Sequence, residues 1–473
     1  MPLPSLLPFF SHPLWADLAL EADPAETGPL ILAAVLLSLV VIYLASKVGG
    51  EICLRINFPA VLGELVGGVI VGISVLHLLV FSEGGAVEPS LISTLLQQTA
   101  GMEPDLTALI SQTCSEVISV MSEIGVIILL FEIGLESDLP GLLQAGLQAA
   151  VVAIVGVAVP FIAGTIGLIY FFHIDTIPAI FAGAALTATS IGITAKVLAE
   201  MQRLSSPEGQ IIIGAAVLDD ILGIIVLAVV ASLAKTGTVE ISNVVYLIIS
   251  SIVFLVGSVV LGRLLSPYFL GLVDRLGTRG SLLIPSLIFA FALAYVAVAL
   301  QLEAILGAFT AGLVLGETER RRELEEQVVP IADMLVPIFF VCVGAKTDIS
   351  VLNPLVPENR PGLIIASFLI VVGILGKMVT GLTVFGRPGI NRLAIGVGMV
   401  PRGEVGLIFA AVGTASGVLS KSLDAAIIAM VIITTFVAPP LLRIVFKPAA
   451  VIVPALATEE GLAIASEAGE SES

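Results

Sequence analysis

Charged residues are scarce in this sequence. Asp, Glu, Lys and Arg make up 12% of its 473 residues and 58% are hydrophobic, whereas an ordinary soluble domain is roughly 25% charged. The long apolar runs also lack the ten-residue alternation of an outer-membrane barrel. Because a backbone in lipid must satisfy its own hydrogen bonds, these runs predict an all-α protein that crosses the membrane many times.

Several motifs are also missing. The three cysteines, Cys53, Cys114 and Cys342, lie far apart in no ligand spacing, so neither a disulfide framework nor a metal site is indicated. The sequence has no Walker motif (Gly-x-x-x-x-Gly-Lys-Ser/Thr) and no basic stripe, so direct use of ATP and binding of nucleic acid are not indicated. We expect no cofactor and no nucleotide-binding domain.

The acidic residues gather in two places. Much of the net charge of -18 lies in the segment "TEEGLAIASEAGESES" and in a predicted loop near residues 82–116, which we interpret as solvated acidic segments. Residues 1–28 contain no Lys or Arg and predict an extracytoplasmic leader, with a cleaved signal as the alternative. Residues 29–446 should form the transmembrane domain. Residues 447–473 predict a disordered cytoplasmic tail, too short for a regulatory domain.

Apolar windows of about 19 residues predict about thirteen spans, the ninth of them short. The spans start near residues 30, 59, 116, 146, 178, 209, 243, 281, 303, 328, 362, 392 and 424. Of the twenty Lys and Arg residues, four fall in predicted outer loops, two fall inside spans and the other fourteen fall on the inner side. Because basic residues collect in the cytoplasm, this split predicts an outer N-terminus and an inner C-terminus.

Costly polar side chains fall at similar depths in four of these spans. At about 1.5 Å of rise per residue, the acid pair of the sixth span lies roughly 16 to 18 Å from its start, near the midplane. The residues are Thr189 and Ser190 in the fifth span, Asp219 and Asp220 in the sixth, Lys377 in the eleventh, and Pro401, Arg402 and Glu404 in the twelfth.

Each of these groups also has a purely structural alternative. Lys377 could extend to the membrane interface, although it lies deep. The two hydroxyls of the fifth span could bond back to their own helix. Pro401 could mark only a kink, with Arg402 and Glu404 as a local bridge, although residues two apart on a helix do not face each other.

The adjacent acids are expected to have unlike surroundings, because neighbouring helical residues point about 100° apart. Lys377 is the one lysine at that depth, and a buried carboxylate and ammonium need each other. The other acid should take up a proton near the working pH, or a small cation once ionised. A site that holds either a proton or a cation is the minimum chemistry of an exchanger. A cation channel and a membrane-embedded sensor are the alternatives.

The segments "TATSIG" and "MVPRGE" are candidates for helix breaks in the fifth and twelfth spans, which run in opposite directions. Broken helices place helix ends and free carbonyls beside an ion site. They predict two inverted halves, spans four to six and eleven to thirteen. Glu64, Glu132 and Asp333, near the predicted cytoplasmic ends of their spans, are either an ion-attracting funnel or ordinary interface charges.

Seven ordered motifs resemble the bacterial sodium/proton antiporters of the monovalent cation:proton antiporter-2 family. The resemblance extends from about residue 30 to 446 and includes "FPAVLGELVGGVIVG", "LLFEIGLESDL", "TATSIGITAKVLAEM", "GAAVLDDILGIIVLAVV", "LGAFTAGLVLG", "LGKMVTG" and "VGMVPRGEVGLI". It implies a homodimer, a core domain with two crossed discontinuous helices, and a dimer domain from the first two spans and those around the eighth and ninth. The core is expected to move like an elevator. Small-residue pairs, Gly68 with Gly72 and Gly312 with Gly316, fit either a dimer interface or ordinary helix packing.

The resemblance also implies roles for individual residues. Asp220 would carry the ion, with Thr189 and Ser190 nearby, while Asp219 would pair with Lys377. Arg402 and Glu404 match charged positions beside the second broken helix.

The double acid implies electrogenic exchange, with more protons than sodium ions moved per cycle. The expected function is secondary Na⁺/H⁺ antiport rather than an enzymatic reaction, with Li⁺ or K⁺ as further substrates and K⁺/H⁺ antiport as the alternative. A bacterial inner membrane, or an internal membrane such as a thylakoid, is the expected location.

Overall fold

The computed structural model describes residues 24–81, 90–100, 104–236, 238–273, 275–357, 359–386 and 389–446. Most of the predicted leader and the whole predicted tail lie outside these residues. All regular elements of the described ranges are helices, and no strand occurs in these ranges. The helices are α2 (Pro24–Arg55), α3 (Ala60–Val71), α4 (Leu91–Ala100), α5 (Pro104–Glu136), α6 (Leu139–Phe172), α7 (Thr176–Ala185), α8 (Ile191–Glu200), α9 (Pro207–Thr236), α10 (Ile241–Val273), α11 (Leu283–Ala299), α12 (Ala304–Leu315), α13 (Arg321–Ala345), η1 (Ile349–Leu352), α14 (Asn359–Met378), η2 (Val379–Thr383), α15 (Arg392–Gly398), α16 (Glu404–Ala415) and α17 (Lys421–Val445).

Eight described helices are long and apolar enough to cross a membrane on their own: α2, α5, α6, α9, α10, α13, α14 with η2, and α17. The shorter α3, α11 and α12 are also apolar, and the pairs α7 with α8 and α15 with α16 each form one interrupted segment. With α4 left aside, the described residues contain thirteen segments in the predicted order. The prediction of an all-α polytopic fold is confirmed, and the ninth segment, α12, is short at 12 residues.

The predicted acidic loop near residues 82–116 is wrong over most of its length. Helix α4 occupies part of it, and α5 begins at Pro104 rather than near residue 116. Ser90 explains the start of α4, because its Oγ accepts the backbone N–H of Ser93 at 3.0 Å, as an N-cap does. Polar residues in the first turns of α5 hid its helical start from a hydropathy window.

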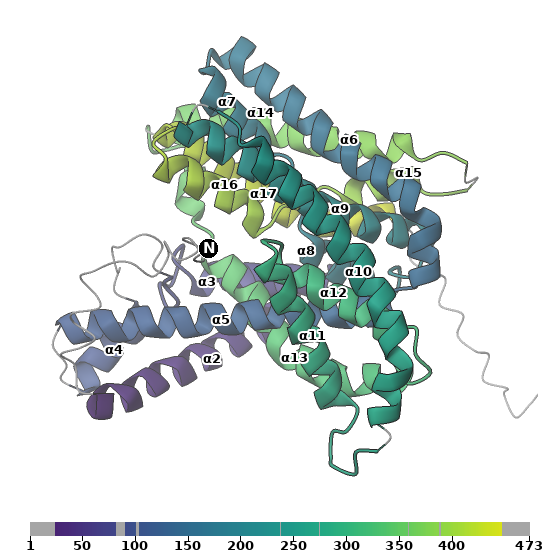
Figure 1. Cartoon of the computed structure of the whole chain (residues 1–473). Coiled ribbons are helices and arrows are strands. Elements are labelled where there is room, and N and C mark those ends of the chain that lie inside the picture. The colour runs from purple at the N-terminus through teal and green to yellow at the C-terminus, as the bar shows by residue number, and fades with distance from the viewer. Residues whose placement is uncertain are drawn as a thin grey trace, which may run out of the picture.

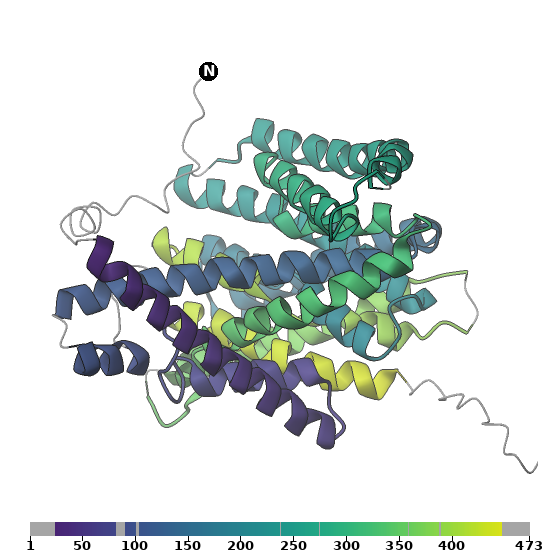
Figure 2. The same ribbon diagram turned by 90° about the horizontal axis from the view of Figure 1, so that it is seen from below.

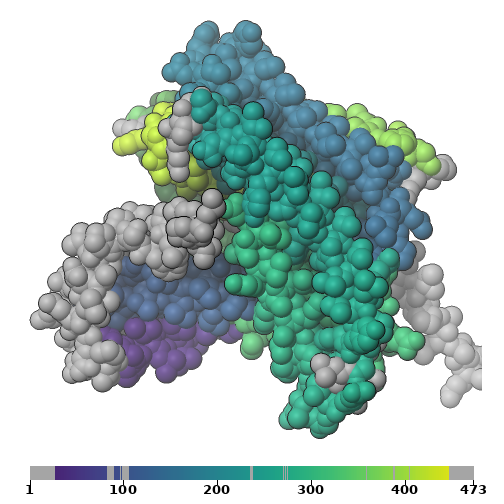
Figure 3. Space-filling view, viewed as in Figure 1, coloured from purple at the N-terminus to yellow at the C-terminus, as the bar shows by residue number. Residues whose placement is uncertain are grey.

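The helices form two bundles (Figure 1). In what we call the glycine-packed bundle, α5 packs along α12 and α13, α3 packs between α2 and α13, and α4 and α11 complete the group. In the broken-helix bundle, α6 packs along α9, α14 packs along α17, and the interrupted pairs lie among them. Helix α10 contacts both α9 and α12, and in the space-filling view α9 and α10 form a teal band across the junction (Figure 3).

Glycines let backbones meet directly in the first bundle. A Cβ on Gly68 would lie 2.2 Å from the carbonyl oxygen of Val341, and one on Gly312 would lie 2.1 Å from that of Phe131. Cβ positions on Gly72 and Gly316 would likewise meet backbone atoms of Ala345 and Leu135. These four glycines therefore pack helices within the chain. Figure 2 shows α2 and α5 of the same bundle crossing one another.

The broken-helix bundle contains two similar sets of three segments. The first set is α6, the interrupted pair α7 with α8, and α9; the second is α14 with η2, the interrupted pair α15 with α16, and α17. In each, the first and last helices pack along one another and an interrupted pair lies beside them. The side chain of Gln148, near the start of α6, donates to the carbonyl of Phe385, after the end of η2, at 2.7 Å. The first helices of the two sets, α6 and α14, therefore run in opposite directions, as an inverted repeat requires.

Contacts between helix ends agree with alternating passage through a membrane. The backbone N–H of Asn391, at the start of α15, donates to Glu208 Oε1, at the start of α9, at 2.8 Å. Its side chain donates to the carbonyl of Val445, the last residue of α17, at 2.9 Å. The thirteen-span topology places all three of these helix ends on one side, where the structure brings them together.

Candidate functional site

The first interruption, between α7 and α8, covers residues 186–190, where every residue is buried. Thr187 Oγ1 donates to the carbonyl of Ala184 at 2.7 Å, which ends α7 with a side-chain bond. Thr189 Oγ1 donates to the carbonyl of Met399 at 3.2 Å. Ser190 stands at the N-cap of α8, where its side chain forms no capping bond. The predicted break at "TATSIG" is thus present.

The second interruption covers residues 399–403 and crosses the first. The backbone N–H of Ser190 donates to the carbonyl of Pro401 at 2.8 Å, and Thr194 Oγ1 donates to that of Gly398 at 3.0 Å. A Cβ on Gly403 would lie 2.8 Å from Ser190 Oγ, so glycine is what permits this close crossing. The two breaks satisfy each other's backbone groups, which a membrane interior otherwise leaves unpaired. Helices α8 and α16 both begin here, so two positive helix ends face the crossing.

A buried ion pair lies beside this crossing. Lys377 Nζ contacts both carboxylate oxygens of Asp219 at 3.2 Å, and both side chains are completely buried. Gly156 of α6 makes room for the ammonium, because a Cβ there would lie 3.3 Å from Nζ. The α-helical part of α14 ends at Met378, one residue after the lysine, and the chain continues as the 3₁₀-helix η2.

Arg402 is a second buried cation at the same place, although its sequence position predicted only a location beside the second broken helix. It is completely buried, and its charge interacts with that of Asp219. Nη1 reaches the carbonyl of Met399 at 3.5 Å, while Nε and Nη2 have no hydrogen-bond partner among the described residues. A Cβ on Gly373 would lie 3.7 Å from Nη2. Gly373 precedes Lys377 by four residues on α14, so the face of this helix that carries Lys377 also approaches Arg402.

Asp220 has different surroundings from Asp219. It is 9% exposed, whereas Asp219 is 0% exposed. Its charge still acts on Lys377, so it lies within electrostatic range of the pair. With both acids ionised, the two carboxylates balance Lys377 and Arg402, and one added proton or monovalent cation makes these four groups positive by one. The arrangement can therefore exchange one positive charge for another.

The remaining predicted residues are Glu404, Glu64, Glu132 and Asp333. The side chain of Glu404 is not among the described ones, although its backbone begins α16. Glu64 accepts a hydrogen bond from Ser46 at 3.0 Å. Lys196 of α8 interacts electrostatically with both Glu64 and Glu132.

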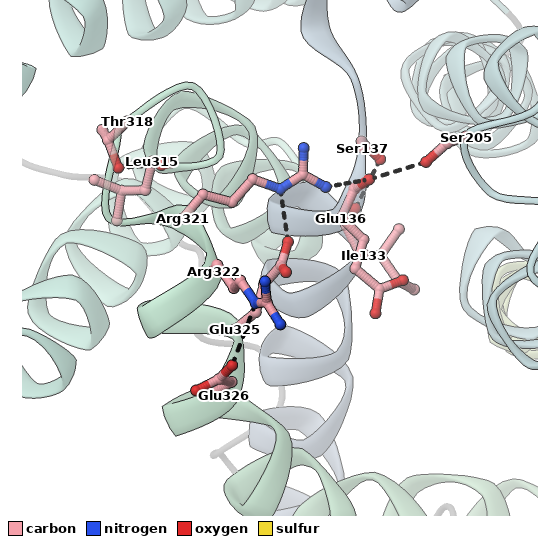
Figure 4. A network of polar contacts seen from close by, with 10 residues as sticks. All are labelled: Ile133, Glu136, Ser137, Ser205, Leu315, Thr318, Arg321, Arg322, Glu325 and Glu326. Carbon is pink, nitrogen blue, oxygen red and sulfur yellow. Dashed lines mark hydrogen bonds and ion pairs between the residues drawn. The ribbon is translucent and has the colours of Figure 1, made fainter. Parts of the chain in front are cut away.

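Asp333 lies midway along α13, which begins at Arg321, further toward the N-terminus than the predicted span. Ion pairs one turn apart, Arg321 with Glu325 at 2.6 Å and Arg322 with Glu326 at 3.5 Å, stabilise the polar start of this helix (Figure 4). A hydropathy window cannot detect such a start.

A small cavity of about 30 Å³ lies between the two bundles. The glycine-packed bundle contributes Leu65, Lys346 and Thr347, and the broken-helix bundle contributes Gly403 and Thr435 among other residues. The cavity therefore reaches from the end of α13 to the second interruption. Its volume suits about one water molecule.

Comparison with known proteins agrees with this geometry. The family model described as "Sodium/hydrogen exchanger, transmembrane" matches residues 31–447. The chain belongs to the sodium/hydrogen exchanger family. This exchanger is 66% identical over 439 residues to the "High-affinity Na(+)/H(+) antiporter NhaS3" of Synechocystis, which covers 92% of this chain and 95% of that protein. It is 32% identical to the "Na(+)/H(+)-K(+) antiporter GerN" of Bacillus cereus, over 86% of this chain and 94% of the relative.

The fold of this exchanger also matches a solved structure. The sodium proton antiporter MjNhaP1 from Methanocaldococcus jannaschii aligns with a TM-score of 0.57 at 16% identity, covering 87% of this chain and 96% of that one. The family resemblance inferred from the motifs is confirmed. The protein is thus an integral membrane transporter whose two interrupted helices cross beside a buried acid pair.

Proposed function

We propose that this exchanger carries out electrogenic Na⁺/H⁺ antiport, in which a proton and a cation compete for Asp220. The observation that carries the proposal is the unequal acid pair: Asp219 is completely buried against Lys377, while its neighbour Asp220 is slightly exposed. Competition for one carboxylate couples the two ions, because a cation can bind only after the proton has left. Release of a proton from Lys377 during the cycle would add charge movement.

The broken-helix bundle is the proposed moving domain, and the glycine-packed bundle is the proposed stationary and dimerising one. The protein then lies in a bacterial inner membrane or a thylakoid, as a homodimer with its N-terminus outside. The cavity that reaches Gly403 from the end of α13 supports an ion path on the predicted outer side. Sodium is the proposed substrate because the relative that is 66% identical bears that name. Potassium is the second candidate, supported by the name of the relative from Bacillus cereus.

Purified protein in liposomes with an imposed pH gradient tests this function. Added Na⁺ should collapse the gradient, and more so at pH 8 than at pH 6, because the carrier carboxylate must be ionised to bind a cation. Asp220→Asn should abolish the exchange. Asp175→Asn is the matched control, because Asp175 is an exposed residue of the same bundle whose side chain forms no capping bond.

Three results would contradict the proposal. A gradient that resists Na⁺, Li⁺ and K⁺ alike excludes exchange, and near-normal activity of Asp220→Asn moves the site elsewhere. Cation flux that is independent of the proton gradient indicates a channel. A response to K⁺ that exceeds the response to Na⁺ selects the second candidate.

A further inference from the structure

The last residue of α8 forms hydrogen bonds across the junction between the two bundles. Glu200 Oε2 accepts the backbone N–H of Ala60 at 3.0 Å, and Oε1 accepts that of Val61 at 3.3 Å. Ala60 and Val61 are the first two residues of α3. A carboxylate of the broken-helix bundle therefore caps a helix of the glycine-packed bundle.

Helix α3 needs this external cap. Its N-cap residue is Pro59, and no side chain within α3 or at its N-cap bonds to the first turn. The first N–H groups of a helix have no partner inside the helix, and a negative charge at that end is stabilised by the helix dipole. Glu200 supplies both the acceptors and the charge.

Further interactions occur near Glu200, at the same end of the junction between the bundles. Ser205, in the link between α8 and α9, donates to the carbonyl of Glu136 at the end of α5 at 3.3 Å (Figure 4). Lys196, one turn before Glu200, and Arg443 of α17 both attract the carboxylate from within its own bundle. Three hydrogen bonds thus join the bundles here, whereas a cavity lies between them further along, beside Leu65 of α3 and the end of α13.

We propose that Glu200 is a latch between the bundles. It stabilises the arrangement described here and must release α3 whenever the broken-helix bundle moves relative to the glycine-packed bundle. Glu200 is a positioning residue, because it acts on the equilibrium between arrangements and does not touch the ion. This proposal rests on the proposed function in one respect: ion exchange must require the broken-helix bundle to move relative to the glycine-packed bundle.

Glu208 provides a matched control. It accepts the backbone N–H of Asn391 at 2.8 Å, so it is also a glutamate that bonds to the backbone at the start of another helix. Both partners lie within the broken-helix bundle, however, so this bond can persist while the bundles move. Glu208→Ala should weaken the bundle without favouring movement.

The test measures the distance between the bundles directly. The three native cysteines are replaced by alanine, and spin labels are attached at Arg55→Cys on α2 and Arg392→Cys on α15, two exposed positions. Double electron–electron resonance in lipid nanodiscs then gives the population of each arrangement. Loss of a helix cap changes an equilibrium by about 2-fold to 30-fold, so Glu200→Ala should shift the populations within that range. Glu200→Gln, which retains one acceptor oxygen, should give an intermediate shift.

Two outcomes overturn the latch. One is an unchanged distance distribution in Glu200→Ala, and the other is an equal shift in Glu208→Ala. Exchange measured on the same proteins separates the latch from the proposed function. If the parent protein exchanges no ions, the function fails, whereas the distance populations still decide the latch.

Discussion

The two bundles differ in the interactions that join most of their helices, although glycine also meets backbone in the second, as at Gly381 with Arg392. In the glycine-packed bundle, backbones meet at positions such as Gly134 with Gly312, where a Cβ on either would lie within 2.3 Å of a carbonyl oxygen of the other helix. In the broken-helix bundle, helices meet through buried charges, Asp219 with Lys377, and through hydroxyl-to-carbonyl bonds. Helices in close backbone contact fit together in one geometry, whereas polar side chains can form new hydrogen bonds or ion pairs when their helices shift. Substitutions should therefore affect mainly stability in the first bundle, and both stability and transport in the second.

Lys377→Ala should give the largest effect. It leaves Asp219 buried without its ammonium, and breaking a buried pair from one side typically costs about 3–5 kcal/mol. Arg402, whose charge also interacts with Asp219, should hold the loss near the lower limit. Thermal unfolding in detergent measures the stability, and charge movement per cycle in liposomes should fall. Lys421→Ala, at an exposed helix start, is the control. Equal unfolding temperatures for the two variants would mean that the pair contributes no stability.

Gly312→Ala should come next. The new Cβ would approach the carbonyl oxygen of Phe131 to 2.1 Å, so α5 and α12 must separate. Such overpacking typically costs about 1–3 kcal/mol of unfolding free energy. Gly257→Ala is the matched control in α10, where a Cβ meets nothing within 4 Å. The exchange rate per folded molecule should remain close to that of the parent. A normal melting temperature would contradict direct backbone packing in this bundle.

Gly403→Ala should have the smallest effect on stability, about 1 kcal/mol, at the lower limit for overpacking, because only a short side chain opposes it. The new Cβ would lie 2.8 Å from Ser190 Oγ and 3.0 Å from its Cβ, which forces the two interruptions apart. Exchange should fall about tenfold, which corresponds to about 1.4 kcal/mol in the barrier. The double variant Ser190→Gly with Gly403→Ala moves the side chain from the first interruption to the second and should restore part of the rate. Full activity in the single variant would show that the crossing tolerates separation.

The order of the spans and both interruptions could be predicted from the sequence, because they depend on local properties. Apolar length predicts a span, and hydroxyl or proline residues at mid-span predict a break. The start of α13 escaped this reasoning. Its first two turns are stabilised by pairs such as Arg321 with Glu325, which a hydropathy window counts against a helix.

The contacts of Arg402 and Glu200 could not be predicted, because each depends on the packing of distant segments. Arg402 follows Asp219 by more than 180 residues, and only the crossing of the two interruptions brings the charges together. The partner of Glu200 is a backbone N–H group, which every residue except proline carries, so no residue type marks it. For Asp219 and Lys377, by contrast, depth and the scarcity of lysine suggested the pairing that the geometry contains.

The contacts of Asn391 with Glu208 and Val445 have an evolutionary consequence. They tie the starts of α9 and α15 and the end of α17 to one face of the membrane, so the chain between any two of these points must cross an even number of times. Loss or gain of a single crossing in either interval would place the hydrogen-bonding partners on opposite faces of the membrane. Descendants of this protein can therefore lengthen or shorten these intervals only by whole hairpins.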